Sequence, residues 1–114
     1  MPRVLVIDDE SSILNSLRSI LIHLDYDVKV PSDGRESIEV FNTEHELDLV
    51  ITDIRMPRMD GNAVARHIRN SDRPDMPIIA ISAFTDELES ELFNSFIKKP
   101  FNIQTLADAI KTFK

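Results

Sequence analysis

The sequence contains no cysteine and only two glycines, and both shortages narrow the kinds of site that it can hold. Without cysteine the fold can use neither disulfide bonds nor thiolate metal ligands, which suits a reducing cytoplasm. Gly34 and Gly61 stand far apart, so the chain has no glycine-rich loop of the kind that cradles nucleotide phosphates. Thiolate sites are therefore excluded, and nucleotide binding is poorly supported.

Long hydrophobic runs and excess positive charge are also missing. No apolar run is long enough to span a bilayer, and Met1-Pro2-Arg3-Val4 does not resemble the start of a secretory signal. The net charge is −7, which argues against direct binding to nucleic acid or anionic lipid because both need clustered Lys and Arg. We therefore expect a cytoplasmic protein that binds neither nucleic acid nor membrane.

What the sequence does contain is a regular alternation of short apolar runs and amphipathic segments. Its 114 residues fit one compact domain, and an apolar fraction of 42% is enough for a core. Continuous apolar runs such as residues 4–7 are typical of strands buried on both faces. The expected strands cover residues 4–7, 27–30, 47–52, 77–81 and 95–98.

Amphipathic segments follow each expected strand. Residues 11–24 carry apolar side chains at spacings of three and four, as one face of a helix does. Shorter helices are expected around Ile38 and Phe41, around Val64, Ala65 and Ile68, and from Asp86 to Phe93, where Asp86 and Glu89 have the spacing of a capping box. Asn102 should cap a last helix with an inner face of Ile103, Leu106, Ile110 and Phe113. Five such alternations predict an α/β fold, a doubly wound parallel sheet with helices on both faces.

Polar residues stand where four of the expected strands end. Asp8 and Asp9 follow the first strand, Asp53 the third, Ser82 the fourth and Lys99 the fifth. Ligands of doubly wound folds bind at this edge of the sheet. Each residue alone could simply mark a strand end, but grouped carboxylates raise one another's pKa unless a positive charge compensates them. The group therefore suggests a site.

A divalent cation would supply that charge. Mg²⁺ prefers oxygen ligands and is usually held by one or two carboxylates together with phosphate oxygens. Ser82 and Lys99 suit contacts to phosphate, because a hydroxyl donates a hydrogen bond and an ammonium is a compact charge. A carboxylate nucleophile, a metal and a lysine together indicate phosphoryl transfer through an aspartyl phosphate.

These residues resemble the receiver domains of response regulators in two-component systems. The resemblance covers nearly the whole chain and rests on five motifs in order: VLVIDDE at 4–10, DLVITDIRMP at 48–57, MDG at 59–61, ISA at 81–83 and KPF at 99–101. It implies a flavodoxin-like (βα)5 fold in which residues 1–114 form one phosphoacceptor domain. Asp53 would accept the phosphoryl group, with Mg²⁺ bound by Asp8, Asp9, Asp53 and the carbonyl of Arg55, and with Mn²⁺ able to substitute.

The same resemblance assigns the remaining roles. Ser82 and Lys99 would hold the phosphoryl oxygens together with the backbone N–H groups of Ile54 and Ala83, and the Lys99–Pro100 bond would be cis. Phosphorylation would draw Ser82 forward, and Phe96 would turn inward behind it; the simpler interpretation of Phe96 is permanent core packing. Arg55 and Phe84 are expected to flank the phosphoryl group and to control the access of water, although both could be ordinary loop side chains.

The chain departs from the family pattern between Ser82 and Lys99. This stretch is several residues shorter than usual, and Phe93-Asn94-Ser95 stands where a pair of small residues normally precedes the fifth strand. We therefore expect a shortened fourth helix.

Two other functions compete with the switch. A phosphohydrolase of the haloacid-dehalogenase class would carry a second Asp two residues after its nucleophile, where this chain has Arg55. A pseudo-receiver would keep the fold as a binding module without phosphorylation, and only the shortened fourth helix favours it.

The partners follow from the phosphoryl chemistry. The three histidines fall on or beside expected helices, away from the strand ends, so the donor histidine should come from a sensor kinase or a histidine phosphotransfer domain. An output domain or downstream protein would read the changed surface. The chain would then be a switch that modifies itself rather than a turnover enzyme.

Overall fold

The computed structural model describes residues 2–31, 33–56, 59–83 and 85–113, and its five strands form one parallel sheet in the order β2-β1-β3-β4-β5. The strands are β1 (Arg3–Ile7), β2 (Asp27–Lys29), β3 (Leu47–Asp53), β4 (Ile78–Ser82) and β5 (Ser95–Lys98). The chain runs outward in one direction from β1 to β2 and in the other from β3 to β5. This reversal places the switch point of the fold between β1 and β3, and it confirms the predicted doubly wound sheet.

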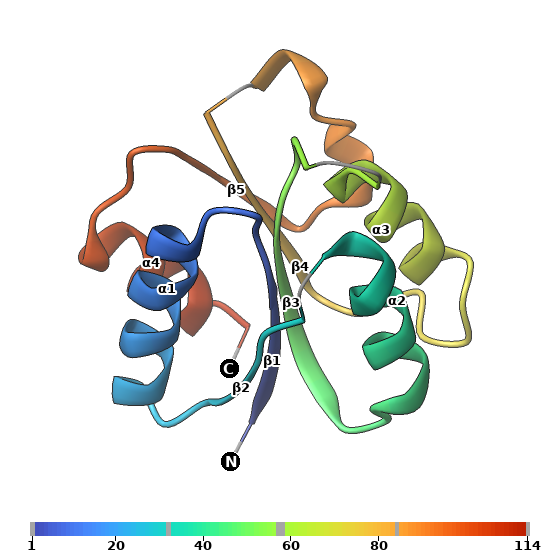
Figure 1. Cartoon of the computed structure of the whole chain (residues 1–114), viewed down its shortest axis with the longest axis horizontal. Helices are drawn as coiled ribbons and strands as arrows, with labels where there is room; N and C mark the ends of the chain where they lie inside the picture. Colours follow the sequence, from blue (N-terminus) through green and yellow to red (C-terminus); the bar gives the residue numbers. More distant parts are fainter. Residues whose placement is uncertain (1, 32, 57–58, 84, 114) are drawn as a thin grey trace.

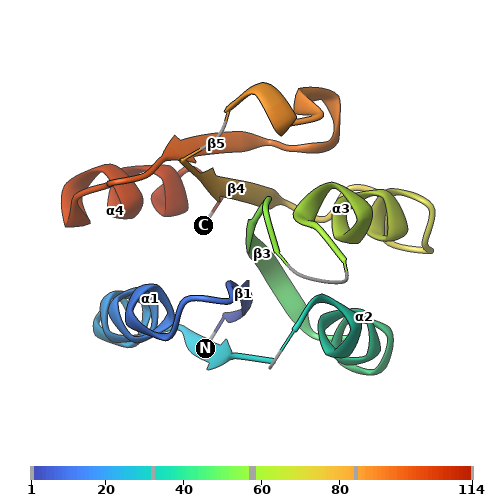
Figure 2. The same ribbon diagram turned by 45° about the horizontal axis from the view of Figure 1, so that its top comes forward.

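Two helices cover each face of the sheet (Figures 1 and 2). Helices α1 (Ser11–His23) and α4 (Ile103–Lys111) lie on one face, and α2 (Gly34–Thr43) and α3 (Gly61–Arg69) lie on the other. Side-chain oxygens of Asp33, Asp60 and Asn102 accept backbone N–H bonds and so cap α2, α3 and α4. Among the described residues, no helix is long and apolar enough to cross a membrane.

Alternate residues of the central strands enter two separate cores. In β1, Val4 and Val6 point into the core beneath α1 and α4, whereas Leu5 and Ile7 point into the core beneath α2 and α3. All four are buried. Because successive side chains of a strand point to opposite faces, a sheet covered on both sides needs apolar residues without alternation. This is why the continuous apolar runs predicted the strands.

The connection from β4 to β5 contains no α-helix in its described part, which corrects the expectation of one from Asp86 to Phe93. It forms two short 3₁₀ turns instead, Thr85–Glu87 and Ser90–Leu92. The connection must run back along β4, whose five residues span about 16 Å. An α-helix of that length needs about 11 residues, which would leave almost none of residues 83–94 for the turns at its ends. The Glu89 carboxylate pairs with Arg66, and without a helix that begins at Asp86 the predicted capping box has no helix to cap.

The last helix differs from prediction at its first residue. Leu106 and Ile110 are buried as expected, but Ile103 is 67% exposed. Ile103 lies in the first turn of α4, where it lines a groove toward α1 instead of reaching the sheet. Helical spacing therefore identified the correct face, but it could not show that the core ends before the first turn of the helix.

A close backbone approach joins α3 to the end of β3. The N–H of Gly61 donates to the carbonyl of Ile54 at 2.8 Å, and a Cβ atom at Gly61 would stand 2.1 Å from the carbonyl oxygen of Asp53. The φ angle of Gly61 is not positive, so the requirement is one of space. The glycine of the MDG motif therefore allows α3 to begin directly beside Asp53.

We expect Gly61→Ala to lower the free energy of unfolding by about 1–3 kcal/mol, because backbone atoms of Asp53 and Ile54 must move. Helix propensity alone would raise the free energy of unfolding, since Ala is favoured over Gly in a helix by about 1 kcal/mol. Urea unfolding would measure the difference. Ser12→Ala, at an exposed position of α1, is the control and should change stability by no more than about 0.5 kcal/mol. Equal or increased stability of Gly61→Ala would contradict the steric argument.

Candidate functional site

The carboxyl ends of the strands bring Asp8, Asp53 and Lys99 into direct contact. Asp8 follows β1, Asp53 is the last residue of β3, and Lys99 follows β5. The ammonium Nζ of Lys99 lies 2.9 Å from Oδ2 of Asp8 and 3.2 Å from Oδ2 of Asp53. One cation thus bridges two buried carboxylates that are 46 and 91 residues from it in sequence.

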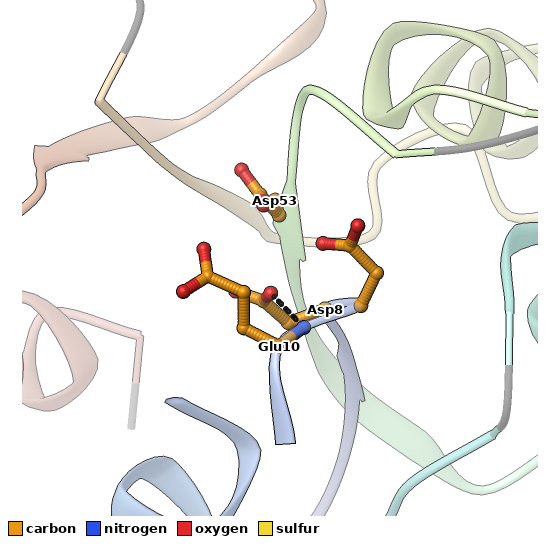
Figure 3. A group of neighbouring side chains, drawn as sticks. Asp8, Glu10 and Asp53 are labelled. Carbon is orange, nitrogen blue, oxygen red and sulfur yellow. Dashed lines mark hydrogen bonds between the residues drawn. The ribbon is translucent and has the colours of Figure 1, made fainter. Parts of the chain in front are cut away.

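A third and a fourth carboxylate stand beside this pair. Asp8, Asp9, Glu10 and Asp53 each offer one oxygen, and these oxygens all lie within 4.8 Å of one another. Figure 3 shows the side chains of Asp8, Glu10 and Asp53 grouped at the ends of β1 and β3. Glu10 also contacts Nζ of Lys99, at 3.3 Å. Sequence reasoning omitted Glu10 from the site, although its place directly after Asp8 and Asp9 was a signal.

Backbone N–H groups orient the two buried carboxylates. Ile54 donates to Oδ1 of Asp53 at 2.8 Å, and Glu10 donates to Oδ1 of Asp8 at 2.9 Å, the bond drawn in Figure 3. Each carboxylate therefore binds a backbone amide with one oxygen and Lys99 with the other. This arrangement fixes the planes of both groups.

The carboxylates open into a cleft of about 480 Å³. Its lining residues come from all the strand ends around the switch point: Asp9, Glu10, Asp53, Arg55, Met56, Ala83 and Lys99. The side chain of Ser82 is fully buried at the end of β4, next to Ala83 of the lining. Phe96 is half-buried on β5, and Phe84 lies outside the described residues. The Lys99–Pro100 peptide bond is cis, as the resemblance implied.

Burial shifts the pKa values of Asp8, Asp53 and Lys99. It raises the pKa of Asp53, and the nearby Lys99 ammonium and the Ile54 N–H offset it only in part. Burial likewise raises the pKa of Asp8 against the opposing effects of its bonds to Glu10 and Lys99. For Lys99, burial lowers the pKa, but contacts with Asp8 and Asp53 outweigh it and leave the pKa raised. The single ammonium therefore compensates the two buried carboxylates incompletely.

The donor set fits a hard divalent cation. The grouped donors are all carboxylate oxygens, the ligand type that Mg²⁺ and Mn²⁺ take in proteins. Two buried carboxylates with raised pKa values would be relieved by a further positive charge beside them. A carboxylate oxygen next to a cation and an ammonium is also the arrangement that phosphoryl transfer to an aspartate requires.

Comparison with known proteins agrees with this geometry. A family model described as the response regulator receiver domain matches residues 4–111. The chain belongs to the response regulator receiver family. Receiver domains are signalling modules of the response regulators in two-component systems. The site described above occupies the motifs on which the resemblance rests.

Relatives and solved structures extend the match. A probable transcriptional regulator ycf27 from Cyanidium caldarium is 35% identical over 96% of this chain, and response regulator MprA from Mycolicibacterium vanbaalenii is 32% identical over 91%. This receiver chain spans only 45–46% of the length of these two relatives. The structure of response regulator TrrA from Thermotoga maritima, in complex with Mg²⁺-BeF, is 32% identical with a TM-score of 0.91, and the match covers 100% of both chains.

We expect Asp53→Asn to raise the free energy of unfolding at pH 7 in the presence of a chelator. Burial raises the pKa of Asp53 in the folded state, so the ionised carboxylate destabilises the fold at any pH above that raised value. The gain should shrink as the pH falls from the raised pKa to the ordinary carboxyl pKa, because the unmodified Asp53 then becomes neutral as well.

Urea unfolding over a pH series would measure this gain, with the exposed Asp75→Asn as the matched control. A gain that is no larger than that of the control, or that does not change with pH, would show that burial of Asp53 does not govern its charge.

Proposed function

We propose that this receiver domain, residues 1–114, accepts a phosphoryl group on Asp53 from a phosphohistidine partner in a Mg²⁺-dependent reaction. The observation that supports the proposal most strongly is the environment of the Asp53 carboxylate. It lies at the end of β3 with one oxygen on the Ile54 N–H, the other on Lys99, and further carboxylates within 4.8 Å. The motifs that carry the family resemblance supply every one of these groups.

Asp8, Asp9 and Asp53 would hold the metal, together with the carbonyl of Arg55. When bound, Mg²⁺ or Mn²⁺ would neutralise charge on the carboxylates and on the phosphoryl oxygens. The oxygen donors of the cluster support this assignment, and so does the Mg²⁺-BeF complex of TrrA. Glu10 would stand at the rim, where its carboxylate contacts Lys99.

Transfer needs an oxygen nucleophile and positive charge on the phosphoryl oxygens. A carboxylate oxygen of Asp53 would bond to phosphorus as the bond from phosphorus to the donor imidazole nitrogen breaks. Lys99 would then turn from Asp53 to a phosphoryl oxygen while Asp8 keeps hold of it, since the Asp8 contact is the shorter of the two. Backbone N–H groups of Ile54 and Ala83 would donate to the same oxygens.

The response would begin at Ser82. Its side chain is fully buried at the end of β4, beside Ala83 of the cleft lining, and its hydroxyl would be drawn toward a phosphoryl group that carries about −1.5 to −2 charges. Phe96 is half-buried on the neighbouring strand β5, so part of its surface is still exposed. We propose that it follows Ser82 inward and changes the surface around β5 and α4 that an output domain or a downstream protein reads.

The partners would be a sensor histidine kinase or a histidine phosphotransfer domain. Several relatives are named transcriptional regulators, which supports a DNA-binding output module beyond this domain. The domain itself, with its charge of −7, is not expected to bind nucleic acid or membrane, and its proposed place is the cytoplasm. Its product is its own altered surface, so we class it as a switch rather than an enzyme with an external substrate.

Incubation with acetyl phosphate and Mg²⁺ should add one phosphoryl group to the intact mass of the chain. The addition should be absent when a chelator replaces Mg²⁺ and absent in Asp53→Asn, because the acceptor oxygen is then lost. Asp75→Asn, which removes an exposed carboxylate elsewhere, should be phosphorylated normally. No added mass in the unmodified chain would favour the pseudo-receiver, a binding module that works without phosphorylation.

Mg²⁺ alone should raise the thermal unfolding midpoint of the unmodified chain. Binding to the folded state stabilises it by about 2.7 kcal/mol at a concentration of 100 times Kd. Asp9→Asn should abolish most of this shift, and the substitution should itself cost little stability because Asp9 is exposed. Asp75→Asn should retain the full shift. An undiminished shift in Asp9→Asn would place the ion outside the proposed site.

A further inference from the structure

The Arg55 side chain forms a two-point ion pair with Glu87 beside the cleft. Arg55 Nε donates to one carboxylate oxygen of Glu87 at 3.2 Å, and a terminal guanidinium nitrogen donates to the other oxygen. Such a bidentate contact fixes direction as well as distance. The bond to Arg55 lowers the pKa of Glu87, so the pair stays charged at neutral pH.

Arg55 connects this ion pair to the phosphorylation site. It follows Asp53 by two residues and lines the same cleft as Asp53, Ala83 and Lys99. The ion pair is half-exposed, with side-chain exposures of 54% for Arg55 and 40% for Glu87. Arg55 therefore borders the cleft with about half of its side chain in contact with solvent.

Glu87 is held in place from α3 rather than by Arg55 alone. The buried Asn62 donates from Nδ2 to the carbonyl of Glu87 at 2.6 Å and accepts the N–H of Glu89 at 3.1 Å with Oδ1. One side chain thus fixes the backbone at the last residue of the 3₁₀ turn Thr85–Glu87 and two residues beyond it. The backbone that carries the Glu87 carboxylate is consequently anchored to α3, and this carboxylate pairs with Arg55 from a fixed position.

We propose that Glu87 is a positioning residue that holds Arg55 across the rim of the cleft and thereby slows the hydrolysis of the aspartyl phosphate. The inference rests on the proposed function of Asp53. In hydrolysis, the oxygen of a water molecule bonds to phosphorus as the bond from phosphorus to the Asp53 oxygen breaks. The products are the Asp53 carboxylate and inorganic phosphate, and the proton of the water passes to solvent or phosphate.

The ion pair would retard this step in two ways. It keeps the Arg55 side chain over the approach of water to the cleft, and it engages the guanidinium donors that could otherwise reach the phosphoryl oxygens. A guanidinium on those oxygens stabilises the charge of a phosphoryl-transfer transition state. Loss of the Glu87 carboxylate removes both restraints, so both effects act toward faster hydrolysis.

The test compares phosphoryl lifetimes in four variants and the unmodified chain. Each is phosphorylated with acetyl phosphate and Mg²⁺, freed of the donor by rapid desalting, and followed by intact mass. Glu87→Gln should lose its phosphoryl group about 3- to 10-fold faster than the unmodified chain. Arg55→Gln combined with Glu87→Gln should match Arg55→Gln alone, because the effect of Glu87 passes through Arg55. Unfolding midpoints and Mg²⁺ affinity should stay unchanged in Glu87→Gln.

Glu89→Gln is the matched control. Glu89 lies in the same connection and also pairs with an arginine, Arg66, but Arg66 does not line the cleft. The phosphoryl group of Glu89→Gln should therefore have the same lifetime as that of the unmodified chain. The inference is overturned if Glu87→Gln has the normal lifetime, if Glu89→Gln is accelerated equally, or if Glu87→Gln still accelerates hydrolysis in the Arg55→Gln background. An unmodified chain that takes up no phosphoryl group would refute the proposed function first, and this inference with it.

Discussion

The contact of one ammonium with two buried carboxylates is the interaction on which the site depends. Lys99 Nζ bridges Asp8 and Asp53 at the edge of the sheet, where both carboxylates are shielded from water. Two such charges repel each other and lose solvation, and the raised pKa values of both acids show that Lys99 compensates them only in part. A fold that keeps this imbalance is prepared for further positive charge at the same place, which gives a divalent cation a physical reason to bind.

The parallel sheet makes that contact possible. The C-terminal ends of β1, β3 and β5 come together only because β1 and β3 are neighbours in the sheet and β4 and β5 follow β3 in order. Apolar side chains on both faces hold these strands at fixed spacing, so the ends cannot separate to relieve the repulsion. Gly61 adds a second constraint, since its missing side chain lets α3 close directly over the end of β3. Packing thus maintains an electrostatic arrangement that would not persist in a flexible chain.

The short connection from β4 to β5 is fastened differently from the other crossovers. Besides the packing of Leu92 and Phe93 against the core, it is held by polar side chains of α3. Arg69 donates to the Leu92 carbonyl at 3.0 Å and to Oδ1 of Asn94 at 2.8 Å, and Asn62 binds the Glu87 carbonyl and the Glu89 N–H at the end of the first 3₁₀ turn. Directional bonds of this kind specify one position for a segment that has too few residues to form an α-helix along the sheet. They also place Glu87 within reach of Arg55, beside the cleft.

The sequence by itself determined the strands, the order of elements and most of the site. Continuous apolar runs mark the buried strands, and Asp8, Asp53 and Lys99 could be located because each follows such a run. Tertiary structure decided the rest. Only the packed chain shows how close the Glu10 carboxylate comes to the others and that the side chain of Ser82 is fully buried. The 3₁₀ turns, the exposed Ile103 and the pair of Arg55 with Glu87 likewise depend on residues that are distant in sequence. The local sequence pattern indicates which side chains are buried in the core. Three-dimensional packing decides how far the core extends and which charged groups come into contact at its edge.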